Sequence, residues 1–156
     1  MKEKPELVLE TARAATQKLV KLPLRLPQEQ FQNDLVAMMQ LATDTATTLR
    51  RVAHEAEPEW AVQAHYETGV LFEEFAHKIL SVPDPEGMAK HGEDAERHAE
   101  ELDQIAARFF KLAQPEYQAC LTRAADIETP YGPMCRKRLQ TLEARTSQPS
   151  GADTQP

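Results

Sequence analysis

Acidic and histidine side chains are the groups in this 156-residue sequence that could hold a metal ion. The five histidines are His54, His65, His77, His91 and His98. Glu74 and His77 form one Glu-x-x-His pair, a spacing that places both side chains on one face of a helix. Di-iron bundles need a second such pair, but Ala95 stands three positions before His98. The zinc motif His-Glu-x-x-His is absent too, so we assign the histidines to solvated helix faces and predict no metal and no other cofactor.

Catalytic patterns based on a phosphorylated histidine, paired carboxylates or a nucleophilic serine are incomplete. His65-Tyr-Glu-Thr-Gly is similar to a histidine-phosphotransfer helix, but Thr68 stands where a lysine would stabilise the phosphate charge, and we favour a partly buried helical histidine. Neighbouring carboxylates such as Glu100 and Glu101 diverge by about 100° on a helix and do not form an acid–base pair. No serine nucleophile elbow occurs. We therefore predict no catalytic residue and expect a protein that is not an enzyme.

Cys120 and Cys135 are the only two cysteines. We expect them on consecutive short helices joined by a turn near residues 127–132, which would bring them opposite each other. A disulfide there would close a loop of about 15 residues and stabilise the fold by ~3 kcal/mol, if the compartment is oxidising. The alternative is two unpaired cysteines that act as small core residues.

Composition excludes several classes of partner. The formal net charge is -7 and no block of basic residues occurs, which argues against nucleic acid because phosphate binding needs clustered Lys and Arg. No apolar run approaches the ~20 residues that span a bilayer, so direct membrane insertion is not expected. The first ten residues are charged and contain no apolar leader segment. Other proteins remain as the expected partners.

Apolar spacing of three and four residues recurs through most of the chain and predicts an all-α fold. The longest such series is Phe31, Leu35, Met38, Ala42, Ala46, Leu49 and Val52. Prolines and turn residues divide the pattern into about six helices. Their expected ranges are 5–22, 28–56, 59–82, 88–113, a short helix through 117–124, and one from 134 onward. Pro115 is taken as the boundary between the fourth and fifth helices.

Short joints between these helices predict antiparallel hairpins stacked in the manner of a tetratricopeptide or other α-solenoid protein. We expect one domain over residues 1–145 and a disordered tail over 146–156, where Ala152 is the only apolar residue. Gly69 lies inside the helix 59–82, where it costs ~1 kcal/mol relative to alanine. We expect it to let a neighbouring helix approach closely.

Small and aromatic residues at helical spacing carry a family resemblance. They are Ala61, Ala64, Gly69 and Phe72 in one helix, and Ala113, Tyr117, Cys120 and Ala124 in another. Together with Trp60, Phe75-Ala76, Pro83-Asp84-Pro85, Tyr131, Arg138-Leu139 and Leu142, they make residues 58–145 resemble the C-terminal helical region of tetratricopeptide-repeat proteins from myxobacteria and related delta-proteobacteria. A complete repeat of about 34 residues cannot be drawn over either helix.

The resemblance implies a non-catalytic protein–protein interaction scaffold, as part or end-cap of a tetratricopeptide-type protein in a cell-envelope assembly, some of which serve gliding motility. It implies a periplasmic location. The alternative is the cytoplasm, because the first ten residues show no apolar export leader. The predicted interface residues are Trp60, Tyr66 and Phe110. Phe110 is included because the neighbouring Phe109 and Phe110 cannot both point inward from one helix turn. The alternative function is a small-molecule or metal-binding helical bundle.

Overall fold

The computed structural model describes residues 3–24, 28–82 and 92–147, and these residues form five α-helices and no strand. The helices are α1 (Pro5–Lys21), α2 (Gln28–Glu55), α3 (Pro58–Leu80), α5 (Gly92–Ala124) and α6 (Tyr131–Ser147). Pro5 and Pro58 open α1 and α3, where the missing proline N–H leaves no helical hydrogen bond unmade. The prediction of an all-α fold is confirmed.

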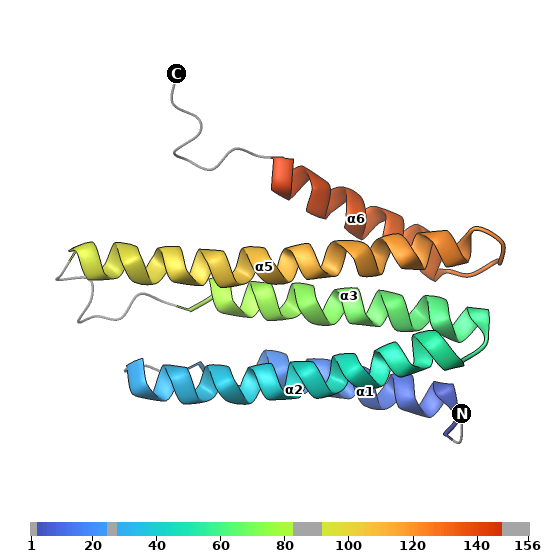
Figure 1. Cartoon of the computed structure of the whole chain (residues 1–156), viewed down its shortest axis with the longest axis horizontal. Helices are drawn as coiled ribbons and strands as arrows, with labels where there is room; N and C mark the ends of the chain where they lie inside the picture. The colour runs from blue at the N-terminus through green and yellow to red at the C-terminus, as the bar shows by residue number, and fades with distance from the viewer. Residues whose placement is uncertain (1–2, 25–27, 83–91, 148–156) are drawn as a thin grey trace.

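Helix α3 packs against every other helix of the described part. It forms one three-helix group with α1 and α2, and a second with α5 and α6. Helices α1, α3 and α6 run in one direction, and α2 and α5 run in the other (Figure 1). The backbones of α1 and α6 do not come close to each other, and neither do those of α2 and α5. The two groups therefore share α3 and leave a gap on each side of it.

The predicted count of six helices is wrong because Pro115 lies inside one continuous helix, α5. Proline removes a hydrogen bond from a helix interior and costs roughly 3 kcal/mol there. The buried stripe of α5 nevertheless continues across it, through Leu102, Ala106, Phe110, Ala113, Tyr117 and Cys120. Pro115 itself is exposed on the opposite face. Burial of the two residues that follow it on the stripe compensates for the missing hydrogen bond, so the helix does not end.

Gly69 has the predicted role of admitting a neighbouring helix. A Cβ atom added at Gly69 would lie 2.4 Å from Cε1 of Tyr117, a distance that carbon atoms do not tolerate. The Tyr117 ring is completely buried. The absent side chain at this position is therefore what allows α5 to lie so close to α3.

The described residues show no repeat and no solenoid. The helices that would correspond in successive hairpins differ in length, with 17 residues in α1 against 23 in α3 and 28 in α2 against 33 in α5. Helix α6 begins at Tyr131, three residues earlier than predicted, because Pro133 fits the first helical turn. The joint expected between the predicted helices 59–82 and 88–113 lies outside the described residues. So does the predicted tail over 146–156, except for Thr146 and Ser147, which belong to α6.

Candidate functional site

A groove of about 510 Å³ lies between α1 and α6, with α3 as its floor. We call it the α1/α6 groove. Its floor consists of Tyr66, Glu67, Val70 and Glu74 of α3. Its walls consist chiefly of Arg13, Val20 and Lys21 of α1, and of Tyr131 and Met134 of α6. Its volume falls in the range of ligand-binding clefts, and it combines apolar walls with a few charged groups.

The carboxylate of Glu67 is the most deeply placed charge of this groove. Glu67 is only 5% exposed, and its Oε1 atom accepts a hydrogen bond of 2.8 Å from Arg13 Nη2. This hydrogen bond and the charge of the carboxylate raise the pKa of Arg13, which stays protonated. One cation of the α1 wall is therefore committed to neutralising Glu67.

Glu74 lies two helical turns further along the same floor and is partly buried. No hydrogen bond or ion pair joins it to another described residue. Lys78 is one turn away on α3, but its Nζ atom donates to the backbone carbonyl of Val20. Lys21 is exposed on the α1 wall and does not reach Glu74 within ion-pair distance. The groove thus holds a carboxylate without a counter-charge among the described residues.

A second buried carboxylate of α3, Glu73, contacts both α5 and α6. Tyr117 donates a hydrogen bond to it, and Arg138 Nη1 lies 3.4 Å from the same oxygen. Burial, and next the charge of Glu73, raise the pKa of Tyr117, so the phenol remains a donor. Arg138 also lies over the ring of Tyr66, 5.5 Å from its centroid. This network positions Tyr66 at the floor of the α1/α6 groove.

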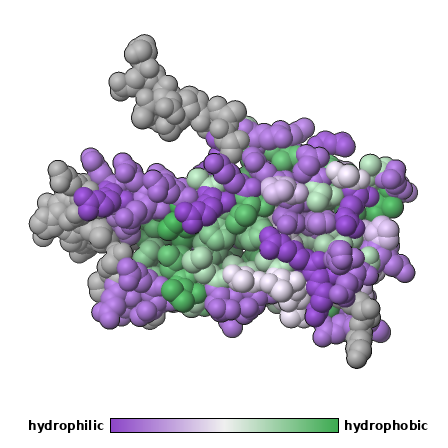
Figure 2. Space-filling view, viewed as in Figure 1, coloured by the Kyte–Doolittle hydropathy of each residue, from purple (hydrophilic) through white to green (hydrophobic). Residues whose placement is uncertain are grey.

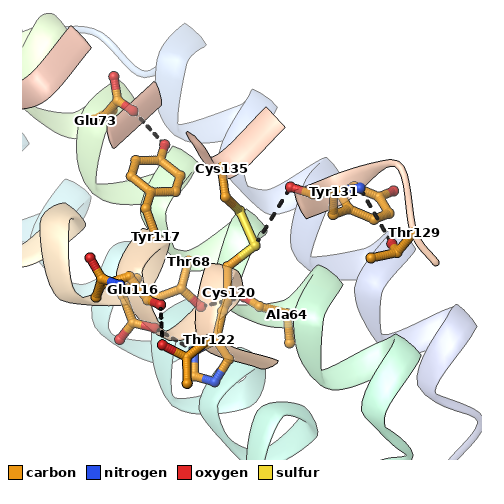
Figure 3. The surroundings of a disulfide bond; sticks show 12 residues. Ala64, Thr68, Glu73, Glu116, Tyr117, Cys120, Thr122, Thr129, Tyr131 and Cys135 are labelled. Carbon is orange, nitrogen blue, oxygen red and sulfur yellow. Dashed lines mark hydrogen bonds and ion pairs between the residues drawn. A yellow bond between two sulfur atoms is a disulfide. The ribbon is translucent and has the colours of Figure 1, made fainter. Parts of the chain in front are cut away.

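A disulfide joins Cys120 of α5 to Cys135 of α6, and both residues are completely buried (Figure 3). The two Cα atoms are 6.4 Å apart. The Cys120 sulfur lies 3.6 Å from the backbone oxygen of Tyr131. Since Tyr131 and Met134 form the α6 wall, the covalent bond fixes that wall next to the groove.

On the other side of α3, a smaller groove of about 260 Å³ separates α2 from α5. We call it the α2/α5 groove. It is lined by Met39, Ala42, Thr43, Ala46, Thr47 and Arg50 of α2, Phe72 of α3, and Phe109 and Leu112 of α5. Figure 2 shows apolar surface gathered between α2 and α5 on this face of the molecule. Met39 and Leu112 are its exposed apolar residues. Arg50 is the one charged residue among those that line it.

The three predicted interface residues are used mainly for packing between helices. Tyr66 is buried between the rings of Tyr117 and Tyr131, at centroid distances of 6.3 and 5.2 Å. Phe110 is buried under Arg145, whose guanidinium lies 4.2 Å from the ring centroid, so a partner would reach it only if α6 moved. Trp60 is partly exposed beside the joint between α5 and α6.

The two residues of the Glu-x-x-His pair have different environments. Glu74 lines the α1/α6 groove, whereas His77 is exposed near Glu73 and Phe110. No group of three or more His, Cys, Asp and Glu side chains is placed to hold a metal within the described ranges. His65 is partly buried, and its Nδ1 atom lies 2.9 Å from Glu116. His91 lies outside the described residues.

Val20, Glu67 and Met134 were not predicted as site residues, and Glu74 was considered only as half of a Glu-x-x-His pair. The available signal was apolar side chains beside the main stripe of their helices, such as Met134, which is 41% exposed. Period alone assigns such residues to the edge of a core. Only the separation of α1 from α6 turns them into walls of a groove.

No family model matches the sequence, and no curated protein or solved structure matches it significantly. No helix in the described part combines the length and the apolar character needed to cross a membrane.

Proposed function

We propose that this chain is a non-catalytic interaction module that binds a short peptide segment of another protein in the α1/α6 groove. The observation that carries the proposal is the groove itself. Val20 and Met134, 40% and 41% exposed, face it from opposite walls, and the rings of Tyr66 and Tyr131 stand at one end. Such apolar anchors with few polar groups are typical of recognition surfaces for peptides.

We also propose that the chain forms part or an end-cap of a tetratricopeptide-type assembly. In support of this, each helix packs on the next, and α1 and α6 both pack on α3, which runs in the same direction. Stacked helical hairpins pack in this way and present such parallel helices as a binding face. A related chain that continues the stack beyond α6 would extend the groove.

An oxidising compartment, such as the periplasm, is the location that we propose for this activity. The buried disulfide between Cys120 and Cys135 supports it, because disulfides of this kind persist where thiols are not kept reduced. A thiol assay on native material tests the location. We expect no titratable thiol, and two titratable thiols would favour the cytoplasm.

Selection from a display library of random 12-residue peptides against the intact, oxidised protein tests the binding function. Selected peptides are then measured by fluorescence anisotropy against wild type, Met134→Glu and Met39→Glu. The two methionines are matched, since they are 41% and 44% exposed and line different grooves. Met134→Glu should weaken binding at least tenfold because it places a charge on the apolar wall, whereas Met39→Glu should leave binding unchanged.

Three results would overturn the proposal. They are a library that yields no binder above background, binders that lose affinity through Met39→Glu instead, and a concentration-dependent dimer that Met134→Glu dissociates. The second result would place the partner in the α2/α5 groove. The third would make a second copy of this chain the occupant of the α1/α6 groove.

A further inference from the structure

We infer that the α1/α6 groove selects partners with a basic side chain, which pairs with Glu74 while flanking apolar residues contact Val20, Val70 and Met134. The inference rests on the proposed function, because it names the chemistry of the peptide that the groove accepts. It goes beyond the function by assigning one residue of this chain as the determinant of specificity.

The floor of the groove carries a negative charge that is uncompensated among the described residues. Both floor charges are carboxylates, Glu67 and Glu74, and both belong to α3. Only Glu67 has a cation, and that cation is Arg13 of the α1 wall. A partly buried carboxylate without a counter-charge loses hydration that nothing in the described part replaces. An incoming ammonium or guanidinium group would replace it.

Two lysines near the groove, Lys78 and Lys21, could compete with a partner for Glu74. Lys78 is held by the Val20 carbonyl, and this hydrogen bond ties α3 to the end of α1. Lys21 is the remaining cation of the lining and is exposed at the rim. Its side chain must give up hydration and rotamer freedom to reach the floor. A partner side chain that enters with an apolar segment is already ordered by that contact.

The groove that contains Glu74 has apolar side chains on its floor and on both walls. Val70 lies one turn before Glu74 on α3, and Val20 and Met134 belong to the two walls of the same groove. The methylene stem of lysine or arginine fits such apolar surroundings while its charged head reaches a carboxylate. An acidic side chain in the same position would instead be repelled by the unpaired charge of Glu74. The groove is therefore suited to a basic anchor and opposed to an acidic one.

The test uses the same peptide library on wild type and on Glu74→Gln, with Glu100→Gln as a matched control. Glu100 is an exposed carboxylate of α5 that does not line the groove. Peptides selected on wild type and on Glu100→Gln should carry Lys or Arg at one recurring position, and those selected on Glu74→Gln should not. Replacing that basic residue by norleucine, or Glu74 by Gln, should weaken binding about tenfold, the two changes together no more than either alone.

Lys21→Gln provides a second variant with the opposite expected sign. Removing this rim cation should strengthen binding of the basic peptide two- to threefold, because it no longer repels the ligand or competes for Glu74. Raising the salt concentration should weaken binding to wild type more than to Glu74→Gln.

The two proposals can fail separately. Binders that depend on Met134 but carry no recurring basic residue would overturn this inference and leave the proposed function standing. Binders with a basic residue whose affinity is unchanged in Glu74→Gln would overturn it as well. A library without binders would overturn both.

Discussion

At the scale of single residues, buried carboxylates of α3 act as fixed points for the surrounding helices. Glu67 receives Arg13 from α1, and Glu73 receives Tyr117 from α5 and Arg138 from α6. A buried charge is costly unless paired, so a sliding movement of any of these helices would leave a carboxylate unpaired. These contacts therefore fix the register of the helices that build the α1/α6 groove.

Gly69→Ala should destabilise the protein by about 1–3 kcal/mol, since a methyl group would overlap the Tyr117 ring. The ring is buried and cannot move aside, so the overlap outweighs the helix propensity gained from alanine, which is ~1 kcal/mol. Urea unfolding measures the change. Gly132→Ala is the control, because its added Cβ would lie 3.3 Å from the Cβ of Ala124, a much milder contact that should cost less stability than Gly69→Ala. Equal stability of wild type and Gly69→Ala would contradict the packing described.

Tyr117 should make the unfolding free energy depend on pH above about 10. Its pKa is raised in the folded state, so the folded protein keeps the phenol proton while the unfolded chain releases it above the ordinary pKa of 10.0. The contribution is complete below pH 10, and stability falls as pH rises further, by up to ~1.4 kcal/mol per pH unit. Urea unfolding of wild type and Tyr117→Phe isolates this slope when it is measured over about one pH unit either side of the ordinary tyrosine pKa. Parallel pH profiles would refute the assignment.

At the scale of helices, α5 is the longest element of the described residues and the one that the prediction divided into two helices. It spans Gly92–Ala124 and contains Pro115. Its C-terminal end carries Tyr117 and Cys120, which attach it to α3 and α6. Without continuity through Pro115, neither residue would stand over its partner. The extent of α5 therefore decides where the α6 wall of the groove lies.

Pro115→Ala should stabilise the protein by about 1–3 kcal/mol, because alanine restores the hydrogen bond to the carbonyl of Lys111 and relieves the clash of the proline ring. Position 115 is exposed, so the change affects little else. Thermal unfolding followed by circular dichroism measures it. A lower unfolding temperature would indicate that the chain needs the proline, for example as a kink.

Loss of the disulfide should destabilise the fold by ~3 kcal/mol, since the bond closes a loop of 15 residues. For a chain of this length that corresponds to a decrease of about 6–12 °C in the unfolding temperature. The double variant Cys120→Ala/Cys135→Ala is compared with wild type by calorimetry. Amide exchange should accelerate first in α6, because α6 depends on this bond for its attachment. Uniform acceleration in all helices would contradict a local role.

At the scale of the whole molecule, the shared helix α3 makes the two three-helix groups one cooperative unit. No pair of helices can separate from the rest without exposing the apolar face of α3, which is buried along most of its length. The gaps on either side of α3 are the grooves. The two candidate binding surfaces therefore lie where the two three-helix groups are not in contact with each other.

Unfolding in urea should show one transition for the described fold. Fluorescence of Trp60, the only tryptophan, reports the start of α3, and far-UV circular dichroism reports all the helices. The two curves should coincide because both groups lose their packing together when α3 is released. Two separated midpoints would show instead that the groups unfold independently.

Local signals were sufficient for the type of fold and most helix ends. The spacing of apolar residues predicted helices throughout, and the helices predicted to begin at residues 5, 28 and 59 begin within one residue of those positions. The cysteine pair and the close approach at Gly69 were also foreseeable, because both follow from residues that have few other uses in a helix. Pro115 misled because a local rule was outweighed by burial on the far side of α5.

The helical, acidic and amphipathic character of this protein follows from residue type and from the period of its apolar residues. The packing of the helices against one another buries Tyr66 and Phe110 and leaves Val20, Met134 and Glu74 facing a groove. This outcome could not be read from local pattern, because the period of apolar residues fixes which face of a helix is apolar but not how many neighbouring helices cover that face. A residue at the edge of that face becomes core or binding surface according to whether another helix lies beside it.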